Sequence, residues 1–197
     1  MLLGMQLCGS HSKLFGRCWQ ASKRHSRRWT RDESGVTAVE FALLALPFFS
    51  IVGAILQTSL IFLASQVLES AVYDTSRTIR TGQAQGAGMT IEGYRSAVCD
   101  RLFGLFPDCS GLHIRVSTVT DFQSANVAPP VASDCEAPCD WAENESWTPG
   151  GGKSVVLVQV YYRYPVVVQL GPLGMANMGD GRRLLGSATV FQNEPFS

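Results

Sequence analysis

The sequence predicts an α+β protein: a long N-terminal helix, membrane-spanning in its first half and amphipathic in its second, packed on a small antiparallel sheet of about three strands with one extra helix. An apolar run from Val36 to Ala64 predicts the span, and an amphipathic run that follows it to Thr81 predicts the continuation. Short runs rich in Val, Ile and Tyr after residue 110 predict the strands. We therefore expect a leader at 1–35, a transmembrane helix at 36–64, its amphipathic continuation at 65–82 and an extracytoplasmic α+β domain at 83–197.

The apolar run is long enough to cross a bilayer. Glu40 and the Gln57-Thr58-Ser59 step are its main interruptions. A hydrocarbon core about 30 Å thick needs about 20 helical residues, whereas the apolar core of a signal peptide has only about 7–15. A single segment in lipid must satisfy its own backbone hydrogen bonds, so it must be helical. Pro47 allows a kink in this helix because proline removes one backbone bond.

Charge predicts the orientation of the helix. Residues 1–35 hold seven Lys/Arg and two acids, a net charge of +5, which leaves −5 for the rest of the neutral chain. Basic residues beside a span mark its cytoplasmic side. We expect a single-pass protein of the inner membrane, with its N-terminus in the cytoplasm and its C-terminal domain outside. The alternative, a basic arm for nucleic acid, is disfavoured because the span follows at once.

The second half of the helix carries apolar side chains at spacings of three and four, as a helix with one buried face requires. Arg77 and Arg80 suit the negative end of the helix dipole, and Gly82 is a plausible stop. Beyond it we expect a linker, a second helix, a half-buried strand, a long loop, the strongest strand with a further extension, and a last strand. These lie at 83–88, 90–106, 112–117, 122–152, 155–164 (extending over 166–170) and 184–192.

The cysteines divide between the leader and the external domain. Cys8 and Cys18 belong to the leader, and the four others fit two disulfides on the oxidising side of the membrane. Three connectivities are open; we favour the local bridges Cys99–Cys109 and Cys135–Cys139. A zinc site that uses these thiols and His113 is the alternative, but the spacings match no common zinc motif.

Nothing in the sequence predicts catalysis, a metal or a cofactor, and we do not expect an enzyme. His113 falls on the polar face of the predicted strand 112–117, where a surface histidine is the simplest interpretation. The run Gly150-Gly-Gly-Lys-Ser154 resembles a phosphate loop but lacks the earlier glycine and the following helix, so we reject nucleotide binding. Trp141 and Trp147 either mark a partner surface or, as is commoner, pack on the sheet.

The start of the apolar run carries a recognisable pattern. Gly35 is followed by four residues, then Glu40-Phe41, then the long helix. This resembles the processing site of type IV pilins of the tight-adherence (Flp) class. The resemblance implies that a prepilin peptidase cuts between Gly35 and Val36, and that Glu40 pairs with the new amine of a neighbouring subunit. A half-made ion pair in lipid is costly, so this pairing would fix the stagger between subunits.

Two further segments extend the resemblance. Ser70 to Gly82 is similar to the segment ending in Arg and Thr-Gly of TadE-like proteins, which are pseudopilins of the tight-adherence apparatus. The ending Asn193-Glu-Pro-Phe196 looks like the usual ending of that family, with Gln192 where Arg is usual. The resemblance implies a pilin-like fold and a role in assembling Flp pili for adhesion and biofilm formation. Its implied partners are the prepilin peptidase, other pilin or pseudopilin subunits, the assembly platform and the bilayer.

Small residues offer candidate contacts between helices in lipid, where close backbone approach is favourable; they are Ala38, Ala42, Ala45 and Gly53. The sequence leaves open whether the subunit enters the filament, primes it or stays in the membrane. The functional alternative from another class is an uncleaved, membrane-anchored domain that binds a partner outside the cell.

Overall fold

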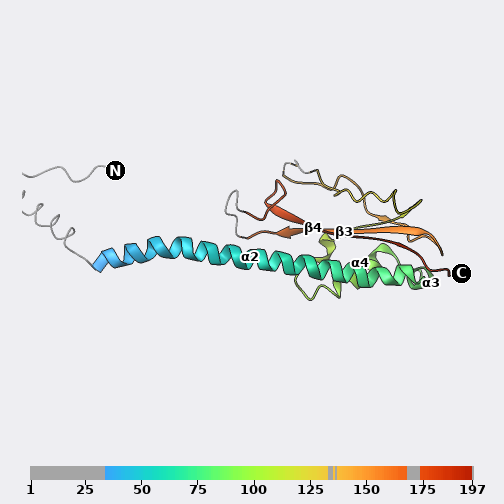
Figure 1. The fold of residues 1–197 in the computed structure, drawn as a ribbon, viewed down its shortest axis with the longest axis horizontal. Coiled ribbons are helices and arrows are strands. Elements are labelled where there is room, and N and C mark those ends of the chain that lie inside the picture. The colour runs from blue at the N-terminus through green and yellow to red at the C-terminus, as the bar shows by residue number, and fades with distance from the viewer. Residues whose placement is uncertain (1–33, 133–134, 136, 168–173, 197) are drawn as a thin grey trace, which may run out of the picture. The chain divides into compact units, whose positions relative to one another are not determined.

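The computed structural model describes residues 34–132, 135, 137–167 and 174–196. The chain forms two units, Met1–Ile51 and Val52–Ser197. The predicted α+β class is confirmed: a long apolar helix is followed by a small mixed sheet with short extra helices (Figure 1).

Helix α2 runs from Ser34 to Arg80 and continues through Pro47, so helix covers nearly the whole predicted range. Its end follows the prediction: Gly82 has φ 79°, a left-handed conformation that glycine adopts without strain. Thr81 N–H donates to the Arg77 carbonyl at 3.0 Å, and Gly82 N–H donates to Ile79 at 3.1 Å. The carbonyls of Arg77 and Ile79, in the last turn of the helix, are therefore satisfied as the chain turns.

The sheet has four strands in the order β2-β1-β3-β4. Three of them are the expected antiparallel strands: β1 (His113–Val119), β3 (Val155–Pro165) and β4 (Arg182–Gln192). The fourth, β2 (Ser146–Trp147), is a two-residue strand parallel to β1. It lies inside the predicted long loop, and two residues are too few for a period-2 pattern to reveal. The expected extension of β3 falls largely outside the described residues.

Both faces of the sheet are covered. Val156, Val158 and Val160 of β3 belong to one core with Leu68 and Val72 of α2. The odd-numbered positions from Gln159 onward face the other way. Gln159 donates to the Asn126 carbonyl, Tyr161 to the Ala128 carbonyl and Arg163 to the Cys139 carbonyl, all in the backbone of the long loop. Burial on two faces explains why β3 reads as a continuous apolar run. The sheet therefore lies between α2 and the loop.

The second predicted helix is shorter than expected. Helix α4 covers Ile91–Cys99, not residues 90–106. The prediction fails because the chain turns at Phe103 and Gly104, whose φ angles of 52° and 71° no α-helix accepts. Cys99 is also bonded to Cys109, so the chain must reverse between them. Residues Gln83–Gly86 form a single helical turn, α3, at the start of the expected linker.

Candidate functional site

The predicted processing segment lies at the start of α2. Gly35 and Val36 are in its first turn, and Val36, Glu40 and Phe41 are all exposed, with Phe41 at 70%. Within the described part of the chain, Glu40 has no hydrogen bond or ion pair. The carboxylate is thus free to meet a group from outside the chain, as the pairing hypothesis requires.

The small residues and Glu40 lie on different faces of the helix. At 100° per residue, Ala38, Ala42 and Ala45 share one face, and Glu40 falls on roughly the opposite one. Gly53 belongs to the second unit and is half-buried. Hence the structure does not gather all the candidate packing residues into one patch: the alanine face and the carboxylate would contact different neighbours.

The first half of α2 exposes apolar side chains on all sides. Leu43, Leu46, Phe48 and Ile51 each expose more than 60% of their surface, and larger exposed apolar surfaces mark contact with a membrane or a partner. Among the described residues, one helix, Gly35–Arg80, is long and apolar enough to cross a membrane. Such a helix fits a membrane protein.

From Gln57 onward one face of α2 is buried by the C-terminal domain. The buried positions recur at spacings of three and four, as expected for one helical face; they are Gln57, Ile61, Ala64, Leu68, Ala71, Val72, Thr75, Ser76 and Ile79. Ser76 and Tyr94 of α4 share a hydrogen bond of 2.9 Å, and burial raises the pKa of this tyrosine, so it stays neutral. The amphipathic pattern in the sequence therefore marks the surface that carries the domain.

The two segments that resemble the TadE-like family beyond the processing site meet in space. Glu194 N–H donates to the Arg80 carbonyl at 2.9 Å, and the two side chains approach to 3.7 Å. A Cβ atom added at Gly82 would lie 2.5 Å from the Phe196 ring. The C-terminal residues therefore close over the end of α2; we call Arg80, Gly82, Asn193, Glu194 and Phe196 the C-terminal latch.

Asn193 fixes the latch to the glycine loop that had resembled a phosphate loop. Its side chain is 2% exposed and donates to the carbonyls of Pro149 and Gly151, each at 3.0 Å. The backbone of Phe196 lies so close to Gly152 that a Cβ there would sit 2.6 Å from it. These glycines thus admit the C-terminus rather than a nucleotide.

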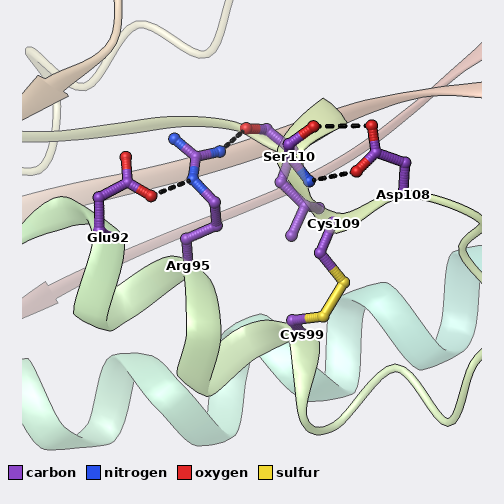
Figure 2. Close-up of a disulfide and its surroundings, with 7 residues drawn as sticks. Glu92, Arg95, Cys99, Asp108, Cys109 and Ser110 are labelled. Atoms are coloured by element: carbon purple, nitrogen blue, oxygen red, sulfur yellow. Dashed lines mark hydrogen bonds and ion pairs between the residues drawn. A yellow bond between two sulfur atoms is a disulfide. The ribbon is translucent and has the colours of Figure 1, made fainter.

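The opposite end of the sheet is held by a disulfide. Cys99 of α4 is bonded to Cys109 of the short 3-10 helix η1 (Cys109–Gly111), the pairing that the sequence favoured. Arg95 lies beside it: its Nε bonds Glu92 at 3.0 Å (Figure 2). Its Nη2 bonds Glu145 at 2.8 Å. Burial disfavours the charge of Arg95, but these two carboxylates outweigh it and raise its pKa. The ion pair with Glu145 thus connects α4 to the long loop, and the pair with Glu92 lies within α4.

His113 is buried, and the expectation of a surface histidine is wrong. It is 4% exposed and stacks on Trp141, with ring centroids 4.2 Å apart. The long loop covers the face that the alternating pattern marked as polar, so burial of that face could not be read from β1 alone. Burial lowers the pKa of His113, and the charges of Arg115, Arg95 and Arg163 lower it further against the opposing effect of Glu145.

The second disulfide, Cys135–Cys139, is again the favoured pairing and lies in the long loop. Cys139 joins Val131 and Met178 in a small cluster against which Trp141 packs, and Arg163 lies 4.6 Å from the centre of the Trp141 ring. Trp147 packs elsewhere: its ring contacts Tyr94, and its Nε1 donates to Met89 at 2.8 Å. Both tryptophans therefore serve the packing of the domain.

The described residues contain no group of three or more side chains suited to hold a metal ion. They offer instead an exposed apolar first half of α2 with one carboxylate, Glu40, and a folded domain packed on the second half. Sequence reasoning missed two exposed apolar side chains, Phe103 and Val167. A Phe-Gly pair inside a predicted helix was the signal that a tight turn stood at the first of them.

Comparison with known proteins gives one match. A family model described as TadE-like protein matches residues 35–77, from the predicted cleavage junction to the buried part of α2. No curated protein and no solved structure matches the chain. The resemblance drawn from the sequence is thus confirmed over this segment, which covers most of α2 and is similar to the TadE-like family.

Proposed function

We propose that the chain is a TadE-like pseudopilin that acts in the assembly of Flp-type, tight-adherence pili. A prepilin peptidase removes residues 1–35, and the mature protein is anchored by residues 36–64, with its domain outside the cytoplasm. The observation that carries the proposal is the agreement between the family match and the exposed part of α2. The family match begins at the predicted junction, and it covers the part of α2 whose apolar side chains the chain itself leaves exposed.

Glu40 has the central role in this proposal. Cleavage creates an ammonium group at Val36, and Glu40 of a neighbouring subunit, displaced along the helix axis, neutralises it. A carboxylate at the edge of the hydrocarbon is costly without such a partner. The Glu40 face and the alanine face point in different directions, so a subunit would use one for the ion pair and the other for close helix packing.

The test compares two glutamates of the same helix. Glu40→Gln removes the proposed partner of the new amine, whereas Glu69→Gln changes an exposed glutamate in the part of α2 that carries the domain. Because a half-made ion pair in low dielectric costs about 3–5 kcal/mol, we expect Glu40→Gln to lower co-purification with sheared filaments or pilin subunits by at least about tenfold. Glu69→Gln should have little effect.

Equal co-purification of the two variants and the wild type would show that Glu40 is not needed for contact with other subunits. The fate of the leader tests the remaining part of the proposal separately. A membrane-bound protein that keeps residues 1–35 would favour the alternative, an uncleaved anchored domain that binds a partner outside the cell.

A further inference from the structure

The two most exposed large apolar side chains among the described residues lie in the external domain, not in the proposed span. Val167 is 84% exposed and Phe103 is 83% exposed. Val167 follows the end of β3, and Phe103 stands in the turn after α4. A single exposed apolar residue is ordinary, so the position and conformation of the two decide whether they form a surface.

Both lie toward the end of the sheet where α2 enters the domain. The Val167 N–H donates to the Gln57 side chain at 3.2 Å, which places Val167 at the level of Gln57. The Tyr164 hydroxyl donates to the Leu105 carbonyl at 3.4 Å, two residues from Phe103. β3 runs alongside the C-terminal part of α2 (Figure 1). Tyr164 precedes Val167 by three residues, which span about 10 Å of strand. The same length of helix is about seven residues. Counting seven residues onward from Gln57 therefore places Tyr164, and with it Phe103, near the level of Ala64.

These levels coincide with the place where α2 leaves the bilayer. About 20 helical residues cross the hydrocarbon. The crossing therefore ends near Leu56 if it begins at Val36, or near Leu60 if it begins after Glu40. At this height the uncovered side of α2 is still apolar: Leu60 and Leu63 are each 49% exposed. Val167 and Phe103 thus lie at heights along α2 where its uncovered side is still apolar.

The backbone at Phe103 is also strained. Phe103 and Gly104 both have positive φ, and Leu105 N–H donates to the Leu102 carbonyl at 3.0 Å, so the two residues occupy the centre of a tight turn. Such turns favour Asn, Asp and Gly at both central positions. Lys153, with φ 66°, shares this strain, but its backbone is bonded to Asn193 of the latch. Strain at an exposed aromatic residue, with no packing to offset it, indicates a contact outside the chain.

We propose that Phe103 and Val167 enter the lipid headgroup region where α2 leaves the bilayer, and so seat the external domain on the membrane surface. This inference rests on the membrane anchorage of the proposed function but not on cleavage or filament assembly. A subunit seated in this way would have to break this lipid contact, besides withdrawing its helix, before it entered a filament.

The test measures depth in the membrane with single fluorescent labels. Cys8→Ser and Cys18→Ser leave the four disulfide-bonded cysteines, and a new cysteine in this full chain then carries a nitrobenzoxadiazole probe. The positions are Phe103→Cys, Val167→Cys and two controls. Phe122→Cys is an exposed phenylalanine just beyond β1, toward the latch, and Leu46→Cys lies inside the proposed span. The chain is reconstituted in phosphatidylcholine–phosphatidylglycerol vesicles with nitroxide lipids of shallow or deep label position.

We expect shallow nitroxides to quench the probes at positions 103 and 167, deep nitroxides to quench the probe at 46, and neither to quench the probe at 122. If the probe at 46 is quenched but either domain probe behaves like that at 122, this inference is wrong and the anchorage stands. If the probe at 46 is not quenched, the proposed anchorage itself fails. Probes at 103 and 167 that gain protection only when pilin subunits are added would identify a protein interface and overturn the assignment to lipid.

Discussion

The two ends of the C-terminal domain are built differently. At the end where Arg80 lies, the C-terminal latch closes over α2. There Glu194 N–H donates to the Arg80 carbonyl, and Asn193 N–H donates to the Ser154 carbonyl. At the end where Gln57 lies, a disulfide holds the chain and two apolar side chains face outward. The first end is therefore held by hydrogen bonds within the chain, although the Oδ1 atom of Asn193 is buried there without a hydrogen-bond partner among the described residues.

This difference indicates which end of the domain meets the rest of the system. A closed end protects the fold, whereas an end with exposed apolar groups and a strained turn is suited to contact. If the comparison is right, substitutions at the Arg80 end should act on stability alone. Substitutions at Phe103 should act on membrane contact, and Phe103→Gly should also raise stability in detergent.

The largest effect is expected at the closed end, from Gly82→Ala. The added Cβ would force an L-residue into a left-handed conformation and displace the Phe196 ring. We expect a loss of about 2–4 kcal/mol in the free energy of unfolding, measured by chemical denaturation in detergent. Gly86→Ala is the matched control, because a Cβ there meets nothing within 4 Å. Equal stability of the two variants would show that the latch contributes little.

At the open end, the next largest effect should follow the loss of the Cys99–Cys109 bond. With a sequence separation of 10, the double change Cys99→Ser and Cys109→Ser should cost about 3 kcal/mol through unfolded-state entropy. The bond Cys135–Cys139 has a separation of 4, and its loss should cost about 2 kcal/mol. The same denaturation measurement ranks the two. A reversed order would mean that the bond in the long loop contributes more to stability than the bond after α4, contrary to the loop-length argument.

Phe103→Gly should have the opposite sign. The variant relieves the left-handed strain and removes no buried contact, so we expect the free energy of unfolding in detergent to rise by about 1 kcal/mol. Phe122→Gly, at an exposed position where no positive φ occurs, should not stabilise the domain. If Phe103→Gly destabilises the protein in detergent, its ring serves the fold and the argument from strain fails.

The smallest effect should be a pH dependence at His113. Its pKa is lowered in the folded state, so the unfolded chain binds the proton more tightly. The stabilisation is complete above the unfolded pKa of about 6.5 and is lost as the pH falls toward the folded pKa. Stability of the wild type should therefore decline from pH 7.5 to pH 5.5, with a smaller decline in His113→Gln. Parallel pH profiles would exclude His113 as the source.

Periodic elements with a strong pattern could be predicted from the sequence. The long helix, its stop at Gly82 and the three main strands each follow from local signals: an apolar run, a glycine and β-branched alternation. Neighbouring cysteines were sufficient to favour both disulfide pairings. The processing segment was recognisable because its spacing is itself the signal, although the role of Glu40 stays a prediction.

What could not be predicted depends on contacts distant in sequence. His113 is buried because residues of the long loop, Trp141 among them, return to cover it. The strand β2 exists because Ser146 and Trp147 lie beside Arg115 and Val116. The meeting of Arg80 and Gly82 with the C-terminal residues joins two motifs that appear unrelated along the chain. No local pattern encodes such pairings, because each segment makes its contacts with a segment that is distant in the sequence.

The N-terminal residue of the membrane-bound protein tests the central claim most directly. The protein should be isolated from cells with and without an active prepilin peptidase, and its intact mass and terminal sequence determined. With the peptidase, the account predicts a chain that begins at Val36; without it, residues 1–35 should remain. A chain that keeps those residues in the presence of the peptidase, or that begins elsewhere than Val36, would contradict the account.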